Sequence, residues 1–174
     1  MDKNPRLIIV SELPGAGKST VAEGIAENFG FPVFSVDPIE SSILKSGIKR
    51  SFETGLAAYI VAETLAAEQL KLGLSVIIDA VNPVPQARQA WQNLAQKYKV
   101  KLIIIECRLD SNIHRKRLES RVRNMHGIAE VSWSDVENLL KEYSPWEDEK
   151  FILDTSKSKQ KNLEEAINYI NSIG

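Results

Sequence analysis

A chain of 174 residues is long enough for one domain with its own hydrophobic core, without disulfides or structural metals. Its formal net charge of −1 provides no global basic field for nucleic acid or an anionic membrane, although local patches remain compatible with it. No apolar stretch approaches the length of a membrane span, and the run near the N-terminus is too short for a signal peptide, so we expect a cytoplasmic protein.

Short runs rich in Val, Ile and Leu alternate with longer amphipathic stretches along the chain. Continuous apolar runs are typical of strands buried on both faces of a parallel sheet, and they predict strands at 6–10, 32–36, 74–79, 100–107 and 150–154. Helices are predicted at 18–29, 38–46, 53–72, 84–98, 110–122, 133–142 and 161–172. The alternation indicates a doubly wound α/β fold in three layers, and no linker or repeat divides residues 1–174 into more than a single domain.

The segment SELPGAGKST, at 11–20, follows the first predicted strand and leads into the first helix. Gly15 and Gly17 allow backbone angles that turn successive N–H groups around one anion, and the helix N-terminus favours the same charge. Lys18 adds a charge that reaches terminal phosphates, and Ser19 offers a hydroxyl to a magnesium ion. These features predict a Walker A loop, a P-loop, in which nucleotide phosphates are surrounded by Pro14, Gly15, Ala16, Gly17, Lys18, Ser19 and Thr20.

Glu12 stands where the Walker A signature has its first glycine. That position lies where the strand leaves the sheet, some distance from the phosphates, so the phosphate contacts are expected to remain. A carboxylate beside the β- and γ-phosphates would repel ATP, and we therefore expect Glu12 to point away from them. How the backbone turns at this position is left open by the sequence.

Polar residues follow each predicted strand, at the edge of a parallel sheet where ligands bind. Asp37 comes after the second strand and is either a general base for an acceptor hydroxyl or only a helix N-cap. Asp79 ends the third strand and is either a Walker-B-like carboxylate that holds magnesium or a purely structural acid. We favour the functional interpretation of both.

The basic run HRKRLESRVRNMHG begins at His114, shortly after the fourth predicted strand. A solvated charged face is the usual explanation of such a run. Its position, however, is the one from which arginines reach the transferred group in phosphotransferases. Arg117 and Arg121 share a helix face, while Arg115 lies elsewhere around the helix. We therefore favour a catalytic role for Arg117 and Arg121.

Three other side chains with reactive chemistry are interpreted as structural. Cys107, the single cysteine, lies in the apolar run VKLIIIEC, which favours a buried small hydrophobe over a reactive thiol. His114 and His126 show no metal-ligand spacing with other His or Cys residues, which favours surface or packing roles.

Together the segments SELPGAGKST, FSVD, CRLDSNIHRKRLESR and YSPWEDEKFILDT resemble a family of small P-loop kinases, whose relatives include polynucleotide kinase, zeta toxin, chloramphenicol phosphotransferase and gluconate kinase. The resemblance extends from about Leu7 to Thr155. It implies a five-stranded parallel sheet of order 2-3-1-4-5, with ATP and Mg²⁺ as cofactors. It fixes the chemistry better than the substrate.

The resemblance also implies roles for individual residues on the phosphate side. Lys18 and Ser19 would bind the ATP phosphates and magnesium, with Asp79 near the metal. Arg117 and Arg121 would reach the transferred phosphate from a lid at roughly 115–135.

On the two flanks of the phosphates, the resemblance implies further contacts. Asp37 would be the base that faces the acceptor hydroxyl, with Arg88 near the acceptor. Arg115 and Thr155 would lie beside the adenine.

The leading hypothesis is an ATP-dependent kinase that phosphorylates a hydroxyl of a small molecule. One alternative is a 5′-hydroxyl nucleic-acid kinase, which the net charge of −1 disfavours. The other is a non-catalytic ATP-binding switch, which would need neither an acceptor base nor a lid. We expect no membrane partner and either a monomer or a homodimer.

Overall fold

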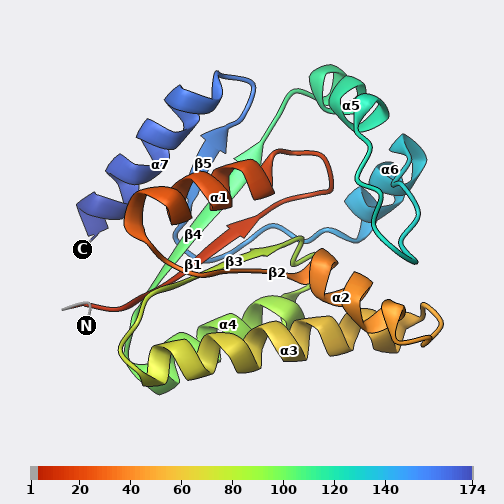
Figure 1. Ribbon diagram of the computed structural model, residues 1–174. Helices are drawn as coiled ribbons and strands as arrows, with labels where there is room; N and C mark the ends of the chain where they lie inside the picture. The colour runs from red at the N-terminus through yellow and green to blue at the C-terminus, as the bar shows by residue number, and fades with distance from the viewer. Residues whose placement is uncertain (1–3, 174) are drawn as a thin grey trace.

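The computed structural model describes residues 4–173, which form one five-stranded sheet with helices around it (Figure 1). The strands are β1 (Arg6–Ser11), β2 (Val33–Ser35), β3 (Val76–Ala80), β4 (Lys101–Arg108) and β5 (Phe151–Asp154). Every pair of neighbouring strands is parallel, and the order is β2-β3-β1-β4-β5. The predicted fold class and strand order are therefore confirmed.

Two helix layers cover the two faces of the sheet. The helices α1 (Lys18–Phe29) and α7 (Lys159–Ile173) lie on one face, and α3 (Phe52–Lys71) and α4 (Pro85–Tyr98) lie on the other (Figure 1). The alternation of side chains along β1 explains the layers, because Ile8 and Val10 join the core under α1 and α7, whereas Leu7 and Ile9 join the core under α3 and α4. The hydrophobic core is thus split in two by the sheet.

Three shorter helices gather at the carboxyl ends of the strands. They are α2 (Val36–Lys45), α5 (Ser111–Ser120) and α6 (Trp133–Glu142), and the segment between α5 and α6 descends toward α2 (Figure 1). A small cluster of Leu13, Leu118 and Val136 packs α5 and α6 against the loop after β1. These helices therefore enclose the edge of the sheet at which parallel α/β folds bind ligands.

The sequence-based boundaries agree with the structure within two residues at every helix end. The difference that matters most for the site is at α2. This helix begins at Val36 rather than at residue 38 and has Ser35 as its N-cap residue. Asp37 consequently lies inside the first helical turn. The alternative in which Asp37 is only an N-cap is therefore wrong.

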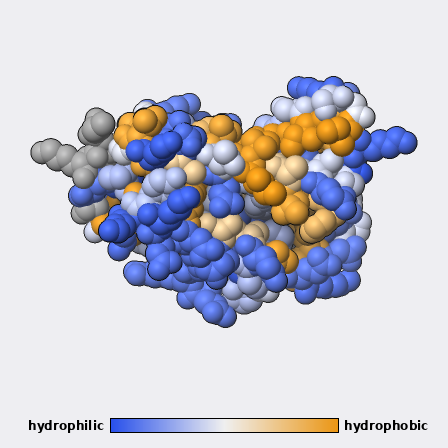
Figure 2. Space-filling model, turned by 90° about the horizontal axis from the view of Figure 1, so that it is seen from below, coloured by the Kyte–Doolittle hydropathy of each residue, from blue (hydrophilic) through white to orange (hydrophobic). Residues whose placement is uncertain are grey.

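The solvent-facing side of α3 is unusually apolar. Figure 2 shows apolar side chains gathered on the face that contains α3, where the exposed ones are Phe52, Leu56, Ile60, Val61 and Leu65. The opposite side of this helix is buried through Ala58, Ala62, Ala66 and Leu70. Apolar patches of this kind are typical of surfaces that contact another molecule. Within residues 4–173, no helix is both long enough and apolar enough to cross a membrane.

Candidate active site

A cavity of about 690 Å³ opens at the carboxyl ends of β1, β2 and β3. It collects most of the residues that the sequence singled out. Those lining it are Pro14, Gly15, Gly17, Lys18, Ser19, Thr20, Asp37, Asp79, Arg117, Arg121 and Thr155. Of the other predicted site residues, Ala16 and Arg115 do not line it.

The loop between β1 and α1 has the backbone that an anion site requires. Gly15 and Gly17 have φ angles of 88° and 94°, in the region that side chains disfavour. A Cβ on Gly15 would also come within 2.9 Å of Leu118 Cδ1, so the loop fits closely under α5. Gly17 is the N-cap of α1 and provides no side-chain cap, which leaves the first amide groups of this helix available to a phosphate.

Lys18 is held inside this loop. Its side chain is largely buried, and Nζ donates a hydrogen bond of 3.1 Å to the carbonyl oxygen of Leu13. This single neutral partner leaves the ammonium group with two unused protons and no ion pair among the described residues. An arriving phosphate would supply the missing negative charge.

Glu12 occupies its glycine position at a conformational cost. Its φ of 153° lies in the range that favours glycine, and Leu13 N donates a hydrogen bond of 3.1 Å to Glu12 Oε1. Burial raises the pKa of this carboxyl, the Leu13 amide opposes that shift, and the negative charge of Glu106 adds to it. Glu12 does not line the cavity, so its carboxylate lies away from the phosphate loop's open side.

Replacing Glu12 with Gly is expected to stabilise the protein. Positive φ at a non-glycine residue costs about 1–3 kcal/mol, of which the greater freedom of glycine in the unfolded chain cancels about 0.5–1 kcal/mol. A net gain of about 1 kcal/mol would raise Tm by about 2–4 °C in a domain of this size. Thermal denaturation measures the shift, and an unchanged or lower Tm would contradict the argument.

The same variant should show a pH signature. Because the pKa of Glu12 is raised in the folded protein, the folded state holds this proton more tightly, and its stability falls as pH rises above the ordinary glutamate pKa. The Tm advantage of Glu12→Gly should therefore be larger at about pH 8 than at about pH 4. Binding of Mg·ATP should stay close to that of the wild type, since Glu12 does not face the cavity.

Ser19 and Asp79 come together at the floor of the cavity. Ser19 Oγ donates to Asp79 Oδ2 at 2.7 Å, and Ser35 Oγ donates to the same oxygen at 3.1 Å. Asp79 is buried at the carboxyl end of β3, which explains why two hydroxyl groups solvate its charge. A hydroxyl and a carboxylate are hard oxygen ligands of the kind that Mg²⁺ prefers, so these residues fit the predicted ion.

Asp37 reaches the cavity from the first turn of α2, where a negative charge is favoured by the helix dipole. It forms an ion pair with Arg123, between Asp37 Oδ2 and Arg123 Nη1. The Asp37 side chain is 42% exposed, and that of Arg123 is 15% exposed. The candidate base is thus accessible from the cavity and engaged by a cation from the segment after α5.

Two arginines after β4, Arg117 and Arg121, differ in their hydrogen bonds. Arg117 Nη1 donates to the carbonyl oxygen of Thr155 at 2.8 Å, which ties α5 to the loop after β5. Arg121 Nε and Nη2 are buried and have no hydrogen-bond partner among the described residues. Burial lowers the pKa of Arg121, and the positive charge of Arg123 lowers it further. Arg121 is therefore the cation most in need of an anionic ligand in this cavity.

Three other residues with predicted ligand contacts have protein partners in the structure. Arg115 is exposed and pairs with Glu119 at 2.8 Å, outside the cavity. Arg88 is buried, and its guanidinium donates to backbone carbonyls of Asn82, Pro83, Ser144 and Pro145, which gives it a structural role. Thr155 Oγ1 donates to the carbonyl oxygens of Ala16, at 2.7 Å, and Arg108, at 3.1 Å. Thr155 thus holds the phosphate loop in place through the backbone of Ala16.

Two residues of the site were not given their structural roles by the sequence. His114 Nε2 lies 2.7 Å from the carbonyl oxygen of Pro14, and because that oxygen can only accept, Nε2 carries the proton. Burial lowers the pKa of His114, which favours this neutral form. Arg123 belongs to the basic run that we singled out, yet only the fold brings it to Asp37. Neither partnership has a signal in the spacing of the sequence.

Residues 7–146 match the protein family described as AAA domain. Among curated proteins, an uncharacterized protein of Mycobacterium bovis is 31% identical over 139 aligned residues, with a coverage of 73% of this chain and 28% of that protein. An adenylate kinase of Agrobacterium fabrum is 28% identical over 130 residues, covering 67% of this chain and 65% of that protein. The chain spans less than a third of the length of the mycobacterial relative.

Solved structures extend the likeness over nearly the whole chain. A provisionally assigned kinase of Chloroflexus aurantiacus has a TM-score of 0.78 at 21% identity and covers 95% of this chain and 98% of its own. A gluconokinase of Sinorhizobium meliloti has a TM-score of 0.69 at 17% identity, covering 98% of this chain and 93% of its own. An APS kinase of Mycobacterium tuberculosis, solved with AMPPNP and APS, has a TM-score of 0.70 at 16% identity, covering 97% and 98%.

At these identities the solved structures show a shared fold, while the match over residues 7–146 shows the family. The resemblance to small P-loop kinases that the motifs predicted is confirmed. The chain belongs to the AAA domain family, and its fold is that of the small P-loop kinases.

Proposed function

We propose that this protein is an ATP-dependent kinase that transfers the γ-phosphoryl group to a hydroxyl of a small molecule. One observation carries the proposal: a phosphate-binding loop, a cavity-facing carboxylate and an arginine that forms no ion pair within residues 4–173 meet in one cavity. These are the groups around Lys18, Asp37 and Arg121. The kinases among the solved structures of the same fold, and the related adenylate kinase, support phosphoryl transfer as the reaction class.

The proposed mechanism assigns one task to each part of the cavity. The amide groups of the loop and Lys18 bind the ATP phosphates. Ser19 and Asp79 would hold Mg²⁺, which neutralises phosphate charge when bound. The acceptor oxygen bonds to the γ-phosphorus, the bond from that phosphorus to the β–γ bridging oxygen breaks, and ADP leaves. Asp37 takes the acceptor proton, and Arg121 stabilises charge on the phosphoryl group in transfer.

The competing functions fit these groups less well. A nucleotide sensor has no use for a carboxylate and a buried arginine that line the same cavity as the phosphate loop. A nucleic-acid kinase needs a basic track toward the acceptor side, which a net charge of −1 disfavours. A small-molecule acceptor is therefore preferred, and the predicted lid, cytoplasmic location and monomeric or dimeric state remain predictions.

A screen for ATP consumption tests the proposal. Purified protein is incubated with Mg·ATP and separate groups of sugars, nucleosides, antibiotics, amino alcohols and oligonucleotides, and ADP formation is followed. Mass spectrometry then identifies a product that is heavier by one phosphoryl group. Lys18→Ala is the matched control, because it removes the phosphate-binding charge while the loop glycines remain.

A hit must give both ADP and a phosphorylated product in the wild type and neither in Lys18→Ala. A phosphorylated oligonucleotide in place of a small molecule would replace the proposed substrate class. Equal turnover by wild type and Lys18→Ala would overturn the assignment of the phosphate loop.

A further inference from the structure

The ion pair between Asp37 and Arg123 occupies the candidate base in the absence of an acceptor. Arg123 Nη1 contacts Asp37 Oδ2, both residues line the cavity, and the Arg123 side chain is only 15% exposed. Arg123 Nε is buried without a hydrogen-bond partner among residues 4–173, and Asp37 is the carboxylate with which this guanidinium forms an ion pair there. The contact is therefore the main polar anchor of the Arg123 side chain.

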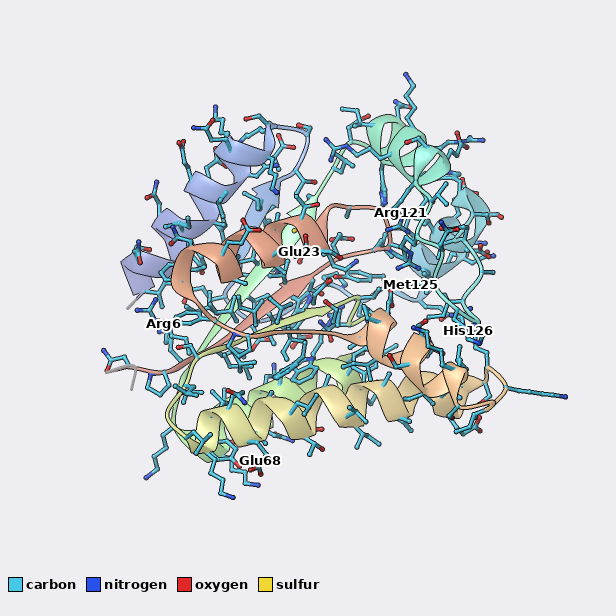
Figure 3. All side chains as sticks on the ribbon, in the orientation of Figure 1. Arg6, Glu23, Glu68, Arg121, Met125 and His126 are labelled. Atoms are coloured by element: carbon cyan, nitrogen blue, oxygen red, sulfur yellow. The ribbon has the colours of Figure 1, made fainter. Side chains whose placement is uncertain are left out.

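The segment that carries Arg123 is docked on α2 by contacts independent of this ion pair. Ser41 Oγ donates to the carbonyl oxygen of His126 at 3.0 Å. Gly127 lies so close to α2 that a Cβ on it would be 2.8 Å from Leu44 Cδ1. Figure 3 shows Arg121, Met125 and His126 along this descending segment, with His126 near the end of α2. The fold thus presents Arg123 to Asp37 rather than leaving the pairing to a free side chain.

A second set of contacts fixes the backbone at Arg123. Glu130 Oε1 accepts hydrogen bonds from Arg123 N at 2.7 Å and from Asn124 N at 3.1 Å. Asn124 has a φ of 49°, the left-handed conformation that a tight turn requires and that Asn tolerates. Glu130 therefore closes a turn that positions Arg123 at the acceptor side of the cavity.

The two neighbouring arginines have different electrostatic partners. Within residues 4–173, Arg121 forms no ion pair and its buried Nε and Nη2 have no hydrogen-bond partner, whereas Arg123 forms an ion pair with the Asp37 carboxylate. Burial lowers the pKa of Arg121 and the positive charge of Arg123 lowers it further, so an anion bound at Arg121 would relieve both effects. We therefore assign them different roles. Arg121 binds the phosphoryl group during transfer, and Arg123 occupies the carboxylate of the candidate base Asp37.

Resting on the proposed kinase function, we propose that Arg123 is a specificity-determining residue: its ion pair with Asp37 suppresses ATP hydrolysis until an acceptor displaces it. In hydrolysis the water oxygen bonds to the γ-phosphorus, the bond to the β–γ bridging oxygen breaks and ADP leaves. A water proton passes to the Asp37 carboxylate. A guanidinium on Asp37 Oδ2 competes with water for that oxygen, whereas a larger acceptor with several contacts can displace it.

Arg123→Met tests this with Mg·ATP alone, so no acceptor needs to be known. We expect ADP formation without acceptor to rise about tenfold or more, a part of the 10²–10⁴-fold range of a general base. The double variant Arg123→Met/Asp37→Asn should lose this rise. Lys141→Met, which removes an exposed cation from α6, is the matched control and should behave as the wild type.

Unchanged hydrolysis in Arg123→Met would overturn the proposal, since Arg123 would then have no effect on the base. Slower hydrolysis would also overturn it, since Arg123 would then assist the base. A rise that persists in the double variant would also overturn it, because the water would be activated by another group. Glu130→Gln provides a second test if Arg123→Met unfolds, as shown by its melting temperature. It loosens the turn that positions Arg123 while keeping both charges of the ion pair, and should raise hydrolysis by a smaller factor.

Failure of this inference is distinguishable from failure of the kinase proposal. ATP binding measured by calorimetry must be weakened in Lys18→Ala if the phosphate loop functions as proposed. With that result in hand, unchanged hydrolysis in Arg123→Met removes only the role of Arg123. Equal ATP binding by wild type and Lys18→Ala would instead remove the proposed function itself.

Discussion

Arg121→Ala is expected to lower the rate of phosphoryl transfer by about 10³–10⁵-fold while changing ATP affinity little, the range observed for arginines that stabilise this kind of transition state. The physical reason is the unpaired, buried Nε and Nη2 of Arg121 in the cavity. Its guanidinium has no structural hydrogen bond to lose among the described residues, so the fold should tolerate the change. Single-turnover kinetics and ATP titration by calorimetry separate the two quantities.

Lys116→Ala is the appropriate control for Arg121→Ala, because it removes an exposed cation from the same region of α5 outside the cavity. Its turnover should match that of the wild type. If Arg121→Ala weakened ATP binding and turnover by the same factor, Arg121 would be a ground-state ligand of the nucleotide. Its assignment to the transition state would then be abandoned.

Asp37→Asn is expected to reduce turnover by about 10²–10⁴-fold, the usual contribution of a general base. Asn keeps the shape of the side chain and accepts a hydrogen bond, yet it cannot take up the acceptor proton. ATP affinity should barely change, since Asp37 lies on α2 and not in the phosphate loop. The measurement is turnover on the acceptor identified by the screen, with ATP affinity and Tm recorded for the same preparations.

The stability cost of Asp37→Asn should be small, because the lost interactions are a helix-dipole term of about 0.3–1 kcal/mol and a half-exposed ion pair. Glu53→Gln removes an exposed carboxylate from the first turn of α3 and controls for the dipole term. Near-normal turnover in Asp37→Asn would move the search for the base to Asp79.

The fold was predictable because its signals are local and repeated. Residues 7–10 of β1 and 76–78 of β3 are uniformly apolar since both faces of these strands are buried, and the pattern is readable without any tertiary information. The start of α2 was harder to predict. The predicted helix began at residue 38, but α2 begins two residues earlier, at Val36.

The site was predictable where a single motif fixes it and not where long-range pairing does. The residues from Gly15 to Ser19 determine the shape of their loop locally, so the motif alone predicts it. The position of Asp79 in the cavity is predictable because it lies at the end of a buried strand. The partnership of Asp37 and Arg123 joins residues 86 positions apart, and only the docking of the segment after α5 creates it. Arg88 is a second case, because the carbonyl partners of this arginine lie partly in a segment more than 50 positions away and have no signal in the local sequence.

The single cysteine can be used to follow the unfolding of this protein by thiol labelling. Cys107 is fully buried in β4, and burial raises the pKa of its thiol to about 12, so the native protein offers thiol reagents almost no thiolate. Labelling of Cys107 therefore requires opening of the sheet core, and its rate measures global unfolding under native conditions. A cysteine placed at an exposed site such as Val122 would label first, which allows a spectroscopic probe to be attached there without altering the native sequence elsewhere.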